Sequence, residues 1–183
     1  MSVGVALALS DLPVVMQRHP EIIRRIYERG GEPEVRFMYD DRQPVLPVWK
    51  DGGLDLVWWG NARGRSRCLP RTGWTWKSTV EQGGWGGSTP GLVRIPAALG
   101  LEKGIWYRVR QGMHGLLVAD EQGRDTVYMI CEPSSHYYQV MTRSNRMPAL
   151  LEEQICTCEP APRISRGGFV DRSRKSFNAG TPA

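Results

Sequence analysis

The chain has 183 residues, with 24 Lys and Arg against 19 Asp and Glu, so its net charge is +5 at pH 7. A content of 40% hydrophobic and 23% charged residues excludes a wholly disordered chain, a coiled coil or a collagen. The longest apolar run, residues 3–9, is too short to span a bilayer, and four cysteines do not make a disulfide scaffold. We therefore expect a cytoplasmic protein with free thiols, no membrane association and one buried core.

The first predicted elements are two helical stretches, residues 11–18 and residues 20–29. Apolar residues recur at helical spacing in the second stretch, and Pro20 suits the first turn of a helix. The pair Gly30-Gly31 would end that helix.

Short runs rich in β-branched and aromatic residues predict strands through the rest of the chain. These runs are residues 35–39, 45–49, 54–59, 105–109, 116–119 and 126–131. Asp51-Gly52-Gly53 is a hairpin signal between two of them. Pro133 opens a helix predicted over residues 133–141, and residues 148–151 form an extended apolar run. The pattern as a whole predicts an α+β domain that is mainly antiparallel β.

Two segments have the composition of irregular structure. Residues 83–91 (GGWGGSTPG) are rich in glycine and predict a mobile loop. Residues 159–183 hold five bases against two acids, a charge of +3, and no apolar cluster. We expect these last residues to be a basic disordered tail that follows a domain of residues 1–158.

Charge and tryptophan are concentrated in one part of the chain. Residues 61–80 contain five bases and no acid, and five of the seven tryptophans lie within residues 58–85. Arginines among exposed aromatic residues are typical of proteins that bind single-stranded nucleic acid, because bases stack on the rings and phosphates pair with guanidinium groups. Alternatively, the tryptophans belong to the core and the arginines to a solvated face, and this part of the sequence does not separate the two.

The sequence contains no strong metal or cofactor motif, so we expect neither group. Cys156 and Cys158 are one residue apart, which is not the spacing of a zinc knuckle. His19, His114 and His136 stand in three unrelated local contexts. The chain also lacks a P-loop, a dinucleotide-binding glycine motif and a nucleophile elbow.

Three stretches, in order, resemble the SOS-response-associated peptidase (SRAP) family, whose members process abasic sites in single-stranded DNA. They are residues 43–60 (QPVLPVWKDGGLDLVWWG), the triplet Asn61-Ala62-Arg63 and residues 128–151 (YMICEPSSHYYQVMTRSNRMPALL). A weaker similarity covers residues 95–97 and 104–107. The clearest resemblance therefore extends over residues 43–151, and it implies an SRAP-like barrel-type domain with a few short helices.

The resemblance also implies DNA contacts. Trp59 is similar to the family tryptophan that stacks near the lesion, and Arg63 and Arg146 are similar to arginines that face phosphates. The residues implied to bind single-stranded or abasic DNA are Trp58, Trp59, Gly60, Arg63, Arg146, Met147 and Pro148.

The catalytic residues of the family are mostly replaced. The family has a cysteine directly after the initiator methionine, whereas this chain has Ser2, whose amine could still form a Schiff base while Asn61 polarises the aldehyde. A serine hydroxyl is a far poorer nucleophile than a thiolate near neutral pH. Ser144 stands at the position of the family histidine, and Tyr107 at that of the family glutamate, with Glu102 the nearest acid upstream.

These replacements leave it undecided whether the protein is an enzyme. The leading hypothesis is a DNA-binding SRAP-like protein with absent or altered crosslinking and peptidase chemistry. An active enzyme that uses Ser2 is a second hypothesis. The alternative from another class is a catalytically inactive, phage-related structural or protein-interaction module.

Overall fold

The computed structural model describes residues 3–85 and 90–151. Ser2, the centre of the predicted glycine-rich loop and the predicted basic tail lie outside these residues. One sheet has five strands in the order β2 (Ile26–Arg29), β3 (Glu32–Met38), β1 (Gly4–Ala8), β8 (Leu99–Glu102) and β9 (Ile105–Arg108). All of its pairings are antiparallel.

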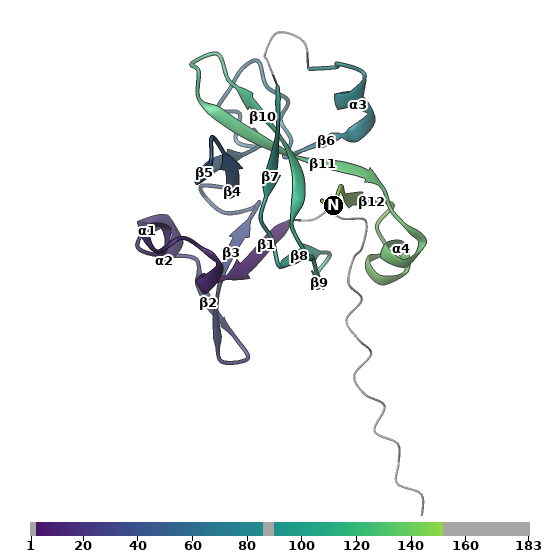
Figure 1. The fold of residues 1–183 in the computed structure, drawn as a ribbon. Helices are drawn as coiled ribbons and strands as arrows, with labels where there is room; N and C mark the ends of the chain where they lie inside the picture. The colour runs from purple at the N-terminus through teal and green to yellow at the C-terminus, as the bar shows by residue number, and fades with distance from the viewer. Residues whose placement is uncertain (1–2, 86–89, 152–183) are drawn as a thin grey trace, which may run out of the picture.

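The second sheet closes into a five-stranded barrel (Figure 1). Its strands follow the order β10 (Met113–Ala119), β7 (Gly91–Ile95), β4 (Val45–Lys50), β5 (Gly53–Trp59) and β11 (Asp125–Pro133). The ring closes because β11 also pairs with β10. Within the ring, only the pairing of β5 with β11 is parallel, and outside the ring β6 (Trp74–Trp76) also pairs with β11 in parallel. The expectation of an α+β, mainly antiparallel, barrel-type domain is confirmed.

Strand β11 is longer than the barrel needs and continues past its rim. There it pairs with β6 (Trp74–Trp76) on the edge used by β5, and with β12 (Arg146–Pro148) on the edge used by β10. Figure 1 shows β11 leading from the barrel toward β12 and α4 (His136–Thr142). The rim of the barrel beside β11 is therefore built from segments that lie far apart in the sequence.

The helices are short and lie outside the sheets. They are the 3-10 turn Leu9–Asp11, α1 (Val14–Gln17), α2 (Pro20–Ile23), α3 (Lys77–Glu81) and α4. Within the described ranges, no helix has the length and apolar character needed to cross a membrane.

One hydrophobic core joins the two sheets. Val5 and Phe37 come from the open sheet, whereas Leu46, Trp59 and Met129 come from the barrel, and all five side chains are fully buried. A second, smaller cluster covers the outer face of β10 and β11, where Leu69 and Trp85 pack. Alternate residues of β11 thus face two different apolar environments, because successive side chains of a strand point to opposite faces.

The strand predictions are confirmed at each of the six runs. The hairpin signal is confirmed as well, since Asp51 and Gly52 both adopt positive φ, 49° and 78°, in the turn between β4 and β5. This conformation suits Asp-Gly, which tolerates the left-handed region at both central positions of the turn.

The helix predicted over residues 20–29 is wrong in its second half. Only Pro20–Ile23 is helical, capped by the His19 side chain, which accepts a hydrogen bond from the Glu21 backbone N–H at 3.2 Å. Ile26–Arg29 is strand β2, paired with β3. Gly30 and Gly31 form the hairpin turn between these strands, with φ of 60° and 88°. A glycine pair fits a helix end and a tight turn equally well.

Two other helix boundaries also differ from the predictions. In the predicted stretch 11–18, Asp11 ends the 3-10 turn and only Val14–Gln17 is α-helical, with Pro13 at the N-cap position. Helix α4 begins at His136 rather than at Pro133, which is the last residue of β11. The Ser135 hydroxyl caps this helix by accepting from the Tyr138 backbone N–H at 3.2 Å.

Candidate nucleic-acid-binding site

The chain leaves the sheet between β5 and β6 and returns to the same edge of β11. This β5–β6 loop, residues 60–73, holds the Asn61-Ala62-Arg63 triplet. The Gly60 backbone N–H donates to Val127 and the Gly73 carbonyl accepts from Met129, so both ends of the loop are fixed to β11. Gly60 has a φ of 62°, and an added Cβ would lie 2.2 Å from the Thr72 carbonyl oxygen, so the loop can close only on glycine.

Asn61 holds the loop together from within. Its side-chain amide donates to the carbonyls of Ser66 and Leu69 at 2.9 and 2.7 Å, and its carbonyl oxygen accepts from the Ser66 backbone N–H at 2.9 Å. The residue is only 3% exposed. An amide committed in this way is not available to polarise an aldehyde, so the geometry gives Asn61 a structural role in place of the expected catalytic one.

Trp59 is a core residue. Its side chain is completely buried, its indole N–H donates to the Gly73 carbonyl at 3.0 Å, and its ring packs edge-on against Tyr39 and Trp74. A ring without exposed surface presents no face to a base. The expectation that Trp59 stacks near a lesion therefore does not fit its position.

Trp58, on the opposite face of β5, is half-buried beneath an arginine from the β5–β6 loop. The guanidinium carbon of Arg65 lies 4.3 Å from the centre of the Trp58 ring, and Arg65 also donates to the Thr126 hydroxyl at 3.0 Å. Burial lowers the pKa of Arg65, and the nearby charge of Arg124 lowers it further. The Trp58 ring is thus partly covered by a cation–π contact with Arg65.

Arg63 is exposed and points to a different part of the surface. Its guanidinium donates to the carbonyl oxygens of Asp40 and Asp41 at 3.3 and 3.0 Å. These two residues lie in the turn between β3 and β4. Arg63 therefore ties the β5–β6 loop to that turn.

Arg146, Met147 and Pro148 form β12, away from the residues above. Trp59 pairs with Val127 of β11, whereas Pro148 pairs with Cys131, on the other edge of the same strand. Four residues along a strand correspond to about 13 Å. The structure therefore does not bring all the expected DNA contacts together. Met147 is buried, with its sulfur accepting from the Ser135 backbone N–H, and Pro148 is buried as well.

Arg146 does meet a tryptophan, and that residue is Trp76. Cys131 of β11 pairs with Trp76 on one edge and with Pro148 on the other, so the three residues stand in one row on the same face. The guanidinium carbon of Arg146 lies 5.5 Å from the centre of the Trp76 ring. Trp76 is 38% exposed, so part of the indole remains open to solvent.

An open cleft of about 580 Å³ lies beside this pair. We call it the Trp76 cleft, and it is lined by Trp76, Lys77, Ser78, Glu81, Cys131, Glu132 and Pro133. An ion pair of 3.6 Å between Lys77 and Glu132 crosses its wall. Both partners keep substantial exposure, so the ion pair can open when a ligand competes for either charge.

Cys131 lines the cleft and is buried, as are three other residues that the sequence analysis singled out. Burial raises the pKa of the Cys131 thiol to about 12, against a lowering by Arg146 and a further raising by Glu102. Glu102 is fully buried, and the Tyr138 hydroxyl lies 3.4 Å from one of its carboxylate oxygens. Ser144 is buried and donates its hydroxyl to the Arg146 carbonyl. Tyr107 is buried in the core.

No cluster of three or more potential metal ligands occurs in the part of the chain that the structure describes. The residue that sequence reasoning failed to single out is Trp76. The alternation Trp-Thr-Trp over residues 74–76 was an available signal, because a strand would place both indoles on one face. Comparison of the chain with protein-family models, with curated proteins and with solved structures gives no match.

Proposed function

We propose that this protein binds single-stranded nucleic acid, with an unpaired base stacked on Trp76 and neighbouring phosphates on Arg146 and Lys77. The single observation that carries the proposal is an exposed indole with a guanidinium over its ring at the edge of an open cleft. Stacking of a base on an aromatic ring contributes about 1–3 kcal/mol and tolerates any base.

The charge balance of the Trp76 cleft limits how strongly it attracts a phosphate chain. Lys77 in the cleft and Arg146 beside it are offset by Glu81 and Glu132 of the cleft. Affinity would therefore come mostly from stacking. With two phosphates contacted on a single strand, the logarithm of the affinity should fall with the logarithm of salt at a slope of about −1.4.

The SRAP resemblance remains part of this proposal. From this resemblance we propose that the preferred ligand is abasic DNA and that the protein is cytoplasmic. Asn61 is committed to its own loop and Cys131 is buried, so the residues described here favour binding without crosslinking. Borohydride trapping on an abasic oligonucleotide tests whether a protein amine forms a Schiff base with the abasic aldehyde. We expect no covalent adduct, and an adduct would establish an active amine.

Fluorescence anisotropy with labelled oligonucleotides tests the binding itself. Abasic and intact single strands should bind more tightly than the matching duplex, and raising salt from 50 to 200 mM should weaken them about sevenfold. Equal affinity for the duplex, or binding insensitive to salt, would rule the proposal out.

A second function is favoured by one observation. Trp59 belongs to the core and Trp58 is covered by Arg65, so part of the tryptophan cluster serves the fold. In a phage-related structural or protein-interaction module, the tryptophans would stabilise the fold in this way and would not contact nucleic acid. A folded chain that binds no nucleic acid in the anisotropy titration would support this function over the first.

A further inference from the structure

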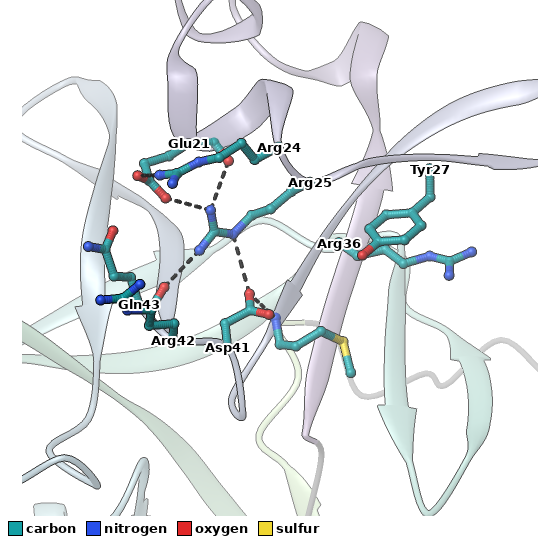
Figure 2. A pocket seen from close by; sticks show the side chains of 9 residues that line it. Glu21, Arg24, Arg25, Tyr27, Arg36, Asp41, Arg42 and Gln43 are labelled. Atoms are coloured by element: carbon teal, nitrogen blue, oxygen red, sulfur yellow. Dashed lines mark hydrogen bonds and ion pairs between the residues drawn. The ribbon is translucent and has the colours of Figure 1, made fainter.

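A cavity of about 240 Å³ lies at the other end of the molecule, between α2, β2, β3 and the turn that follows β3. Four of its nine lining residues are arginines, and we call it the arginine pocket. They are Arg24, Arg25, Arg36 and Arg42. Figure 2 shows Arg25 at the centre of this group, with Arg36 and Tyr27 on one side and Arg42 and Gln43 on the other.

Arg25 forms the buried base of the arginine pocket. Its guanidinium donates to both the carbonyl and the carboxylate of Glu21, at 2.9 and 2.6 Å, and to the Gln43 carbonyl at 2.7 Å. Asp41 lies 3.4 Å from its Nε atom. These contacts join α2 to the turn after β3, so the walls of the pocket are held in place before any ligand arrives.

The carboxylates near the arginine pocket are outnumbered by arginines. Glu21 is bound to Arg24 and Arg25. Glu34 accepts from Arg29 and Arg36 at 2.7 and 2.5 Å, and these two arginines lower the pKa of Glu34 against the raising effect of its burial. Among the nine residues that line the pocket, four arginines stand against the two carboxylates of Glu21 and Asp41, an excess of +2.

Arg42 is the arginine best placed to receive a ligand. It is exposed at the rim, and it makes no hydrogen bond or ion pair with any residue among 3–85 and 90–151. A guanidinium carries five N–H donors in a planar fork that matches the oxygens of a phosphate. Because these donors are free, replacing Arg42 should weaken anion binding more than replacing any other arginine of the pocket.

We propose that the arginine pocket binds a phosphate monoester. The excess of +2 matches the charge of nearly −2 that a monoester carries at pH 7. The pocket is smaller than the roughly 300–1,000 Å³ typical of drug-sized ligands, so it suits a phosphate headgroup. Such a group is found on a small phosphorylated molecule and at the 5′ end of a nucleic-acid strand. The proposal is independent of the Trp76 cleft, which needs no terminal phosphate.

Isothermal titration calorimetry of the full chain tests the proposal, with 5′-AMP as probe and adenosine, cyclic AMP and succinate as comparisons. We expect 5′-AMP to bind and adenosine, which has no phosphate, to give no heat of binding. Cyclic AMP, a diester with one negative charge, and succinate, a dicarboxylate, should bind at least several-fold more weakly than 5′-AMP. Arg42→Gln and Arg24→Gln should each weaken 5′-AMP binding about tenfold or more, the value of a hydrogen bond to a charged group. Arg94→Gln, an exposed arginine on β7, is the matched control and should change nothing.

Oligonucleotides with a 5′-phosphate or a 5′-hydroxyl, titrated into the Trp76→Ala variant, identify the source of the group. Tighter binding of the phosphorylated strand, displaced by 5′-AMP, assigns the site to strand ends, whereas binding of 5′-AMP alone assigns it to a small molecule. Either result supports a monoester site even if Trp76 binds no base. The proposal is overturned if neither ligand binds, if adenosine or succinate matches 5′-AMP, or if Arg94→Gln loses as much affinity as Arg42→Gln.

Discussion

The guanidinium of Arg146 lies over the indole of Trp76, 5.5 Å from the centre of the ring, across the extension of β11. The two residues are 70 positions apart in the sequence and meet because β6 and β12 pair with opposite edges of one strand. Their contact joins the tryptophan- and arginine-rich segment to residues 128–151. It also makes Trp76, in place of Trp59, the tryptophan to test for base stacking.

Trp59→Ala should lower the free energy of unfolding by about 3–5 kcal/mol, because it empties a large volume in the core and removes the indole hydrogen bond to the Gly73 carbonyl, which keeps only its bond from the Met129 backbone N–H. Urea denaturation followed by circular dichroism measures this change. Trp49→Ala, at an indole that is 43% exposed, should cost far less. Similar losses in the two variants would contradict the burial of Trp59.

Asn61→Ala should loosen the β5–β6 loop without unfolding the barrel. The change removes three hydrogen bonds and leaves the Ser66 and Leu69 carbonyls unsatisfied, at a cost of about 1–3 kcal/mol for each buried group. Limited trypsin digestion should then cut the loop at its arginines faster than in the parent chain. Asn145→Ala, at an exposed position, should leave the rate of trypsin cleavage unchanged. If the Asn61→Ala variant were cleaved as slowly as the parent chain, the Asn61 amide would not hold the loop.

Glu121 should keep the β5–β6 loop docked well into the acid range. Hydrogen bonds from the Ser66 hydroxyl and the Arg67 backbone N–H lower the pKa of Glu121 from 4.5 to about 2. A lowered pKa in the folded state stabilises the fold above pH 4.5, and this contribution is lost as the pH falls through about 2. NMR titration of the Glu121 carboxyl should show the low value, and Glu121→Gln should remove the part of the pH dependence of stability that this carboxyl contributes. A midpoint near 4.5 would contradict the contact.

Cys131 should be unreactive toward alkylating reagents while the protein is folded, because burial raises the pKa of its thiol to about 12 and covers the sulfur. Cys68 is exposed and should react at once. Iodoacetamide labelling followed by peptide mass mapping compares the two in a single sample. Labelling of Cys131 at the rate of Cys68 would show that the floor of the Trp76 cleft opens.

Local patterns predicted the barrel strands β4, β5, β10 and β11, because their runs are short, β-branched and separated by turn residues, but they did not predict β7 of the barrel, nor β6 and β8. The same patterns misplaced residues 26–29, where Ile26 and Tyr27 fit both a helix face and a strand. Their pairing with β3 is a tertiary contact that local spacing does not contain. Strand β1 was missed for a similar reason, since its apolar run is buried in the middle of a sheet formed by distant segments.

The candidate site was predictable in composition but not in geometry. Arg63 and Arg146 were both expected to face phosphates. In the structure, Arg63 instead donates to the turn after β3, and Arg146 lies over the Trp76 ring. Which tryptophan is exposed depends on the register of β5 and β6 against β11, because side chains alternate between the core and the surface. No spacing within the Trp-rich segment reveals that register.

The most direct test of the proposed function is the affinity of Trp76→Ala for a labelled single-stranded oligonucleotide, compared with Trp49→Ala. Loss of one stacked base should weaken binding by about 1–3 kcal/mol, a factor of roughly 5 to 150, in the Trp76 variant. Trp49→Ala, at an indole of similar exposure (43% against 38%) outside the cleft, should bind like the parent chain. Unchanged affinity in a folded Trp76→Ala variant, or an equal loss in both variants, would contradict base stacking on Trp76.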